Sequence, residues 1–393
     1  MEDEARGYRR MMVALFAAGV ATFVELYAVQ GVLPEISREL GISAADSALT
    51  VSVATGALAV GVLGWAWIAD RIGRLTSMRI AVVAAIALSV GATLAQDFVT
   101  LLVLRGLTGV VLGAVPVLAV AYVHERLGGG RAAAAATVYI SGTTIGGAAG
   151  RLIAGPLAPF TGWRNALLVI SAISLLAAIA FILLAPAGAR PAHAHVPQLV
   201  RIRSALARPA LLRFYLQAFL LTGCYVAVYN YLAFRLEAPP FAISAALASL
   251  IFFAYFAGTI SSRLAGSWLP RLGAERTILI GLASMLAGLA VMALGAIWIV
   301  IVGLVLFTAG FFLAHASAVA ATGFRSGPEF RGQAGALYNV GFYLGSGVGG
   351  WALGLVFDRG GWLPMTLATA GPIVLAAAMA IPGALRRRAV AHA

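Results

Sequence analysis

The pentapeptide Asp70-Arg71-Ile72-Gly73-Arg74 (DRIGR) separates two long apolar runs, Val51–Ala69 (VSVATGALAVGVLGWAWIA) and Met78–Ala95 (MRIAVVAAIALSVGATLA). Each run has about 20 residues, enough for a helix to cross the roughly 30 Å hydrocarbon core of a membrane. The three charges of the pentapeptide cannot lie in hydrocarbon, so it marks a membrane surface. Its glycine permits a tight reversal of the chain. This stretch therefore predicts two transmembrane helices joined by a short polar turn.

The composition extends this interpretation to the whole chain. Of 393 residues, 62% are hydrophobic and 10% are charged, whereas a soluble domain has about 25% charged residues. Hydropathy and length predict twelve spans, at about 11–33, 48–69, 78–96, 99–122, 134–159, 164–185, 211–233, 243–267, 277–295, 297–321, 333–356 and 362–384. The predicted fold class is an all-α polytopic membrane protein with twelve helices in two six-helix bundles.

A Pro-, His- and Arg-rich segment divides the predicted spans into two sets of six. We predict an N-terminal bundle over 1–185, a cytoplasmic linker over 186–209 and a C-terminal bundle over 210–393. All 27 basic residues are Arg, a bacterial composition, and they gather on alternate loops. Because Arg-rich loops lie on the cytoplasmic side, both termini are expected there and the chain in the inner membrane. The net charge of +13 is assigned to this topology, so no nucleic-acid partner is predicted.

The charged turn returns at Pro270–Thr277, where Arg271 matches Arg71 and Gly273 matches Gly73 at an offset of 200 (271 − 71). Further pairs share this offset or one of 199: Thr108 with Thr308, Gly147 with Gly347, Gly150 with Gly350 and Gly162 with Gly361. The chain is therefore two copies of one unit. Parallel six-span halves with a central site between them are a transporter architecture.

In the charged turn from Asp70 to Arg74, the sequence resembles that of the major facilitator superfamily. Its motif between spans two and three, G-x-x-x-D-R-x-G-R-[RK], is met by Asp70, Arg71, Gly73 and Arg74, with Ala66 in place of the first Gly. The resemblance implies that these four residues form a cytoplasmic latch that breaks as the transporter opens. The alternative is a surface loop whose charges only set topology.

Two further motifs narrow the resemblance. Arg105 is similar to the fourth-span arginine of this superfamily, which implies a role in proton coupling. In the fifth span, drug:proton antiporters have G-P-x-x-G-G, whereas this chain has Gly146-Gly147-Ala148-Ala149-Gly150-Arg151 and lacks the Pro. The whole chain resembles the drug:proton antiporter branch and the YnfM-type efflux permeases.

Glu25 is the carboxylate that lies far from any predicted span end. Low dielectric disfavours the charged form of a carboxylic acid, so such a group can take up and release a proton near neutral pH. Proton coupling needs this property, and a cationic substrate could compete with the proton. The alternative is a structural ion pair with Arg105, which could also bind an anion or brace its helix against backbone carbonyls.

His315 completes the predicted proton-coupling set of Glu25, Arg105 and His315, because its imidazole titrates near physiological pH. Its alternative is hydrogen-bonded packing. Ligand pockets combine apolar walls with a few polar groups. On that basis, the predicted substrate-binding residues are Tyr27, Gln30, Tyr139, Arg151, Tyr255, Asn339 and Tyr343. For Arg151, a structural brace in a Gly-rich, closely packed region is the alternative.

The sequence thus predicts proton-driven export of small amphipathic compounds by alternating access, through a monomer in membrane lipid that needs no cofactor beyond the proton gradient. Import of a sugar or small organic anion is the alternative, favoured by two arginines with one deep carboxylate. An enzyme is not expected, because the sequence has no nucleophile–base set, no metal-ligand spacing and no phosphate-binding loop.

Overall fold

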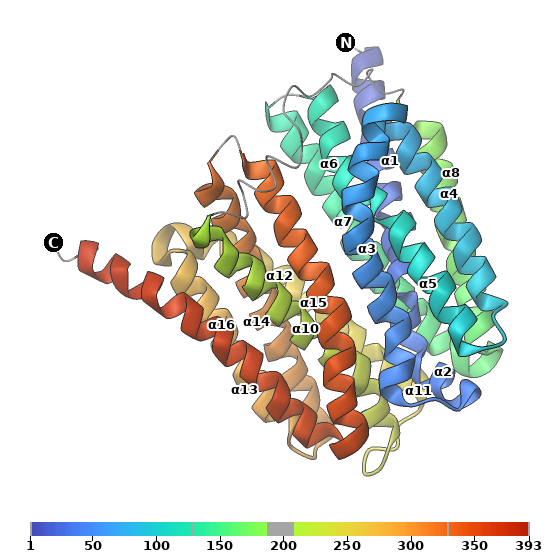
Figure 1. Ribbon diagram of the computed structural model, residues 1–393, viewed down its shortest axis with the longest axis vertical. Coiled ribbons are helices and arrows are strands. Elements are labelled where there is room, and N and C mark those ends of the chain that lie inside the picture. The colour runs from blue at the N-terminus through green and yellow to red at the C-terminus, as the bar shows by residue number, and fades with distance from the viewer. Residues whose placement is uncertain (1, 128, 187–207, 328–329, 392–393) are drawn as a thin grey trace. The chain divides into compact units, whose positions relative to one another are not determined.

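The computed structural model describes residues 2–127, 129–186, 208–327 and 330–391. Within these ranges the chain is almost wholly helical and has no strand (Figure 1). Eleven spans in the described residues are long and apolar enough to cross a membrane. A further helix, α7 (Gly129–Thr161), has 33 residues and is less apolar because it is rich in Gly and Thr. The prediction of an all-α polytopic membrane protein is confirmed, and the helices are consistent with twelve spans.

The described helices form two compact units. Unit 1 holds the first half of the chain, coloured blue to green in Figure 1, together with Ala245–Leu250. Its elements are α1 (Glu2–Tyr27), the 3-10 helix η1 (Ala28–Val32), α2 (Leu33–Leu40), α3 (Ala44–Ile72), α4 (Arg74–Thr93), α5 (Phe98–Leu112), α6 (Ala114–Arg126), α7, α8 (Trp163–Leu184) and α11 (Ala245–Ala248). Within it, α1 packs against α7 and α8.

Unit 2 holds the second half of the chain. Its elements are α10 (Pro209–Glu237), α12 (Tyr255–Leu272), α13 (Ala274–Met292), α14 (Ile297–Ser326), α15 (Arg331–Gly360) and α16 (Trp362–Ala391). The 3-10 helix η2 (Ser249–Ala254) leads into α12, and the unit boundary falls within it, after Leu250. Most of the predicted linker over 186–209 lies outside the described residues. The predicted boundaries 1–185 and 210–393 therefore stay a prediction.

The charged turn has the same backbone geometry in both units. Gly73 has φ 87° and donates its N–H to the Ala69 carbonyl at 2.9 Å. Gly273 has φ 82° and donates to the Leu269 carbonyl at 3.0 Å. A positive φ is open to glycine at little steric cost, and glycine is the common residue after a helix end. The duplicated glycine therefore supports the predicted repeat at this turn.

The offset of 200 does not hold for the close contacts of α1 with α7 and of α10 with α15. A Cβ on Gly142 of α7 would lie 2.3 Å from the Phe16 carbonyl oxygen of α1, and one on Gly345 of α15 would lie 2.0 Å from that of Phe219 on α10. These equivalent contacts are 203 residues apart (345 − 142 and 219 − 16). The predicted pairing of Gly147 with Gly347 is wrong by three residues. Small insertions and deletions between helices shift the register, while close packing keeps the glycines in equivalent places.

Among the described residues, three long helical segments are interrupted rather than continuous, and one of them is the segment over 245–272, which is divided into α11, η2 and α12. The predicted span over 11–33 ends as an α-helix at Tyr27 and continues as the 3-10 helix η1 before α2. The predicted span over 99–122 divides at Gly113 into α5 and α6. A 3-10 stretch within a long helix often marks a functional hinge, because it leaves carbonyl groups without their usual i+4 donors. The break after Tyr27 is where the candidate site lies.

Candidate functional site

Arg105 caps the break in α1. Its side chain comes from α5 and is 2% exposed. Nη2 donates to the Leu26 carbonyl at 2.8 Å, Nη1 to the Glu25 carbonyl at 3.3 Å and Nε to the Thr50 carbonyl of α3 at 3.1 Å. The C-terminal carbonyls of a helix carry partial negative charge, so a guanidinium group there is favourable. Arg105 therefore joins α1, α3 and α5 through backbone oxygens.

These contacts show a brace rather than an ion pair at Arg105. Among the described residues, it makes no ion pair with the Glu25 carboxylate, and its donors go to carbonyl oxygens instead. The brace against backbone carbonyls is the arrangement that forms. Its positive charge still lies close enough to interact with the Glu25 carboxyl group. Its predicted role in proton coupling stays a prediction.

The Glu25 side chain is 4% exposed and points toward α4 and α8 of unit 1. The hydroxyl groups of Ser89 on α4 and of Ser171 and Ser174 on α8 lie around its carboxyl group. Glu25 Oε1 is nevertheless buried without a hydrogen-bond partner of good geometry among the described residues. A buried carboxyl oxygen in that condition is costly when charged, so the group is suited to bind a proton.

Arg151 meets the same break from the side of α7. Nε donates to Gln30 Oε1 at 2.6 Å, Nη1 donates to the Gly147 carbonyl at 2.8 Å, and Cζ lies 4.3 Å from the centre of the Tyr27 ring. Three predicted substrate-binding residues, Tyr27, Gln30 and Arg151, are thus brought together in unit 1. Tyr27 and Gln30 face α7, whereas Glu25 faces α4 and α8. This difference is expected, because Tyr27 and Gln30 are two and five residues beyond Glu25 and so point in other directions from a helix.

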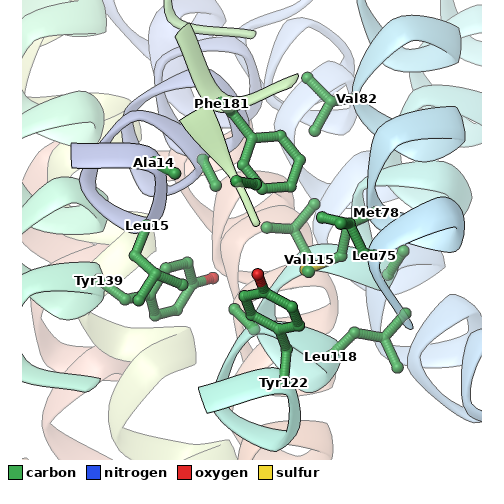
Figure 2. Close-up of a cluster of buried hydrophobic side chains, with 14 of the residues drawn as sticks. Ala14, Leu15, Leu75, Met78, Val82, Val115, Leu118, Tyr122, Tyr139 and Phe181 are labelled. Carbon is green, nitrogen blue, oxygen red and sulfur yellow. The ribbon is translucent and has the colours of Figure 1, made fainter. Parts of the chain in front are cut away.

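Tyr139 does not join this group. Figure 2 shows its ring beside Leu15 in a cluster of buried apolar side chains that includes Val115, Tyr122 and Phe181. It is 4% exposed, and its hydroxyl has no hydrogen-bond partner among the described residues. Its surroundings are those of a core residue, and its predicted role in substrate binding rests on no contact with the break in α1.

His315 lies in unit 2, on α14. Its Nδ1 and the Tyr338 hydroxyl of α15 are hydrogen-bonded at 2.9 Å, and its ring stacks on Phe311 with centroids 5.7 Å apart and planes 8° apart. This is the hydrogen-bonded packing that was the alternative for His315. Tyr338 is a partner that sequence reasoning did not select.

The other predicted residues of unit 2 have different surroundings. Tyr255 contacts the rings of Tyr225 and Phe312, at centroid distances of 5.7 and 5.9 Å. Tyr343 is buried and lies edge-on to Phe342, at 5.3 Å. Asn339 is exposed. Tyr255 is thus part of an aromatic cluster in which the rings of Tyr225 and Phe311 are stacked. This cluster was not predicted from the sequence.

In the charged turn of unit 1, the two arginines contact residues other than Asp70. Arg74 Nη1 lies 2.7 Å from Glu125 Oε1, which ties α4 to the end of α6, and Arg71 Cζ lies 3.4 Å from the centre of the Trp67 ring. Asp70 is exposed and makes no ion pair with either arginine in the described part of the chain. The latch role of Asp70, Arg71, Gly73 and Arg74 stays a prediction, and Glu125 is an additional member of the cluster.

The neighbours of Glu25 that sequence reasoning missed are the three serines around its carboxyl group. Ser171 and Ser174 are three residues apart, so they share one face of α8. A pair of hydroxyls on one face of an otherwise apolar span was the available signal. It became informative only when paired with an acid on another helix.

A helical chain of two similar units, each with polar groups buried among apolar spans, has the features of a multi-span membrane transporter. Comparison with known proteins agrees with this class. A family model described as Major Facilitator Superfamily matches residues 15–239. The chain belongs to the major facilitator superfamily, which confirms the resemblance drawn from the sequence.

Full-length relatives support this assignment. The chain is 38% identical over 358 residues to the inner membrane transport protein YnfM of Escherichia coli, covering 90% of this chain and 86% of that protein. It is 33% identical over 363 residues to the uncharacterized MFS-type transporter YybF of Bacillus subtilis, covering 91% and 89%. It also resembles the inward-facing, unoccupied structure of a bacterial homolog of the human lysosomal transporter Spinster, with a TM-score of 0.80, 16% identity and coverage of 96% and 97%. At that identity the structural match shows the fold alone.

Proposed function

We propose that this transporter exports small amphipathic compounds in exchange for protons that move inward. The observation that carries the proposal is the Glu25 carboxyl group, which is buried with an oxygen that no described residue satisfies. An ionisable group within a transmembrane helix is costly and defaults to a functional hypothesis. The nearby Arg105 charge offsets part of the cost of ionisation, so both protonation states of Glu25 are accessible during a transport cycle.

The break in α1 offers a route from proton binding to substrate binding. Arg105 holds the carbonyls of Glu25 and Leu26 on one side of the break, and Arg151 holds Gln30 on the other. A change in the charge of Glu25 alters the electrostatic balance at Arg105 and thereby the helix end that Arg105 caps. Three of the substrate-contacting residues assigned to unit 1 lie at this break: Tyr27 and Gln30 are on the interrupted segment, and Arg151 of α7 packs against it.

The remaining assignments belong to the same proposal. His315, with Tyr338, is a second proton-coupling position. Tyr255, Asn339 and Tyr343 are substrate contacts from unit 2, and Tyr139 is one from unit 1. The charged turn of Asp70 through Arg74 acts as the cytoplasmic latch. The protein works as a monomer in the bacterial inner membrane with both termini in the cytoplasm, and the proton gradient, without a bound cofactor, supplies the energy.

Transport into inverted membrane vesicles with an imposed pH gradient tests the proposal. The probe is ethidium, a fluorescent amphipathic cation, and the variant is Glu25→Gln, which keeps the shape of the side chain and cannot ionise. Parent vesicles are expected to accumulate ethidium until the gradient is collapsed by an ionophore, whereas the variant does not accumulate it. If Glu25→Gln concentrates the probe as fast as the parent, the role assigned to Glu25 is wrong.

Import of a small organic anion is the second candidate. It is favoured by two buried arginines, Arg105 and Arg151, against one deep carboxylate in the described part of unit 1. Uptake of a radiolabelled aromatic monocarboxylate by intact cells separates the two candidates. Net uptake that requires the transporter supports import, whereas exclusion of ethidium supports export.

A further inference from the structure

We propose that Glu25, Ser89, Ser171 and Ser174 form an internal water site between α1, α4 and α8, through which the proton reaches and leaves the Glu25 carboxyl group. This inference rests on the proposed proton-coupled function and adds the positioning residues and the bound molecule. The site lies wholly within unit 1.

Unsatisfied oxygen atoms are the main observation. Glu25 Oε1, Ser89 Oγ and Ser171 Oγ are all buried without a hydrogen-bond partner of good geometry among the described residues. The two hydroxyls lie beside that same carboxyl group. Buried polar atoms are satisfied in the great majority of cases, by protein or by ordered water. Glu25 Oε1 and the two serine hydroxyls could supply the two to four polar partners that a buried water molecule needs.

Ser174, the fourth residue of the proposed site, holds α8 against α1. Ser174 Oγ donates to the Ala21 carbonyl of α1 at 3.0 Å. Ala21 lies one helical turn before Glu25, so this bond holds α8 against α1 at the level of the carboxyl group. Ser171 lies on the same face of α8 as Ser174, and Ser89 approaches from α4. Two helices, α4 and α8, thus supply hydroxyl groups that both donate and accept hydrogen bonds.

The charges around the carboxyl group favour water over a metal ion. Arg105 of α5 is the charged side chain that faces Glu25, and Thr50 of α3 contributes the carbonyl that holds it. On α7, the Arg151 side chain contacts Tyr27, beyond Glu25 in the sequence of α1. On α6, the basic residues His124 and Arg126 lie in the last turn of the helix. Since Arg105 already balances the carboxylate, a sodium ion would add an uncompensated charge in low dielectric.

The proton step is a simple transfer. A proton from hydronium in the aqueous phase is relayed through the site water: one O–H bond of that water breaks as the Oε1–H bond forms on Glu25, and a new O–H bond forms on the same water oxygen, so the site water stays neutral. Release is the reverse transfer. Serine hydroxyls orient the water in both states because each can turn its hydrogen toward or away from it.

Infrared difference spectroscopy of the purified protein between acidic and alkaline pH tests the inference. A protonated-carboxyl band that is lost in Glu25→Gln identifies the Glu25 proton. Ser89→Ala and Ser171→Ala are each expected to shift that band, and exchange into ¹⁸O-water is expected to shift a water band of the parent that both variants lose. Ser171→Thr keeps a hydroxyl and is expected to restore the water band.

Ser77→Ala is the matched control, because Ser77 is also buried on α4 but donates to the Gly73 carbonyl at 2.9 Å, away from the site. A Glu25 band that is unmoved in both serine variants, with no ¹⁸O-sensitive band, overturns the water site and leaves the proposed function standing. Absence of any Glu25 band in the parent overturns the proposed function itself. A shift of the Glu25 band when sodium replaces choline at constant pH shows that an ion occupies the site instead.

Discussion

Replacing Arg105 by alanine tests whether the guanidinium group braces the break in α1. The substitution removes three hydrogen bonds from a charged donor to the carbonyls of Glu25, Leu26 and Thr50. Such bonds contribute about 1.5–3 kcal/mol each, so the three together contribute at most about 4.5–9 kcal/mol. Two of the bonds are longer than 3.0 Å and relief of the buried charge offsets part of the loss, so we expect a net destabilisation of about 3–5 kcal/mol.

Thermal unfolding in detergent, followed by circular dichroism, measures this loss. For a unit of about 150–250 residues, 1 kcal/mol shifts Tm by about 2–4 °C, so Arg105→Ala is expected to melt about 6–20 °C below the parent. Arg105→Lys keeps the charge, but a single ammonium group cannot span carbonyls on two helices, so about half of the loss is expected.

Arg9→Ala is the control, because Arg9 is exposed in the same unit and such surface changes cost within about 0.5 kcal/mol. If Arg105→Ala and Arg9→Ala melt together at the temperature of the parent, Arg105 does not brace α1. The structural reading of its contacts is then refuted, even if transport is lost.

Two further predictions concern single helices. Gly109→Ala is expected to destabilise the protein by about 1–3 kcal/mol or more, because its Cβ would lie 2.0 Å from the Ala54 carbonyl oxygen. Gly106→Ala on the same helix is expected to be neutral or stabilising, because its Cβ would meet only a side chain at 3.8 Å. Equal melting temperatures for the two variants would contradict the packing of α3 on α5. Asp97 caps α5, and hydrogen bonds from Thr100 lower the pKa of its carboxyl group, so this stabilisation is present above the ordinary Asp pKa and is lost as pH falls through the lowered value. The extra thermal stability of the parent over Asp97→Asn should therefore begin to fall below about pH 4 and vanish once the pH is below the lowered pKa, and a difference that is unchanged in acid would contradict the cap.

The architecture was predictable because it depends on local composition. The charged turn from Asp70 to Arg74, its copy at Gly273 and the apolar runs beside them are visible in the sequence, and membrane insertion imposes a narrow range of span lengths. These features led to the correct family. The register between the two copies was only approximately predictable, because contacts such as that of Gly142 with Phe16 keep their geometry while connecting segments change length.

The candidate site was predictable in part. Glu25, Arg105 and Arg151 were selected because charged groups in apolar spans are conspicuous. The break after Tyr27 was not, since it is held by partners 80 and 121 residues away in the sequence. The direction of the Glu25 side chain likewise depends on which helices pack against α1. Serines have no such conspicuous signal, so the polar surroundings of the carboxyl group emerge only in three dimensions.

Proton release on substrate binding is the most direct test of the central claim, that Glu25 exchanges its proton as the transporter binds its cargo. Purified protein in weakly buffered detergent solution is mixed with ethidium, and the pH change is followed with an indicator dye. We expect a release of protons that saturates with the probe and is absent in Glu25→Gln, while the Ser77→Ala control behaves as the parent. An equal release from Glu25→Gln would contradict the account and assign the coupled proton to another group.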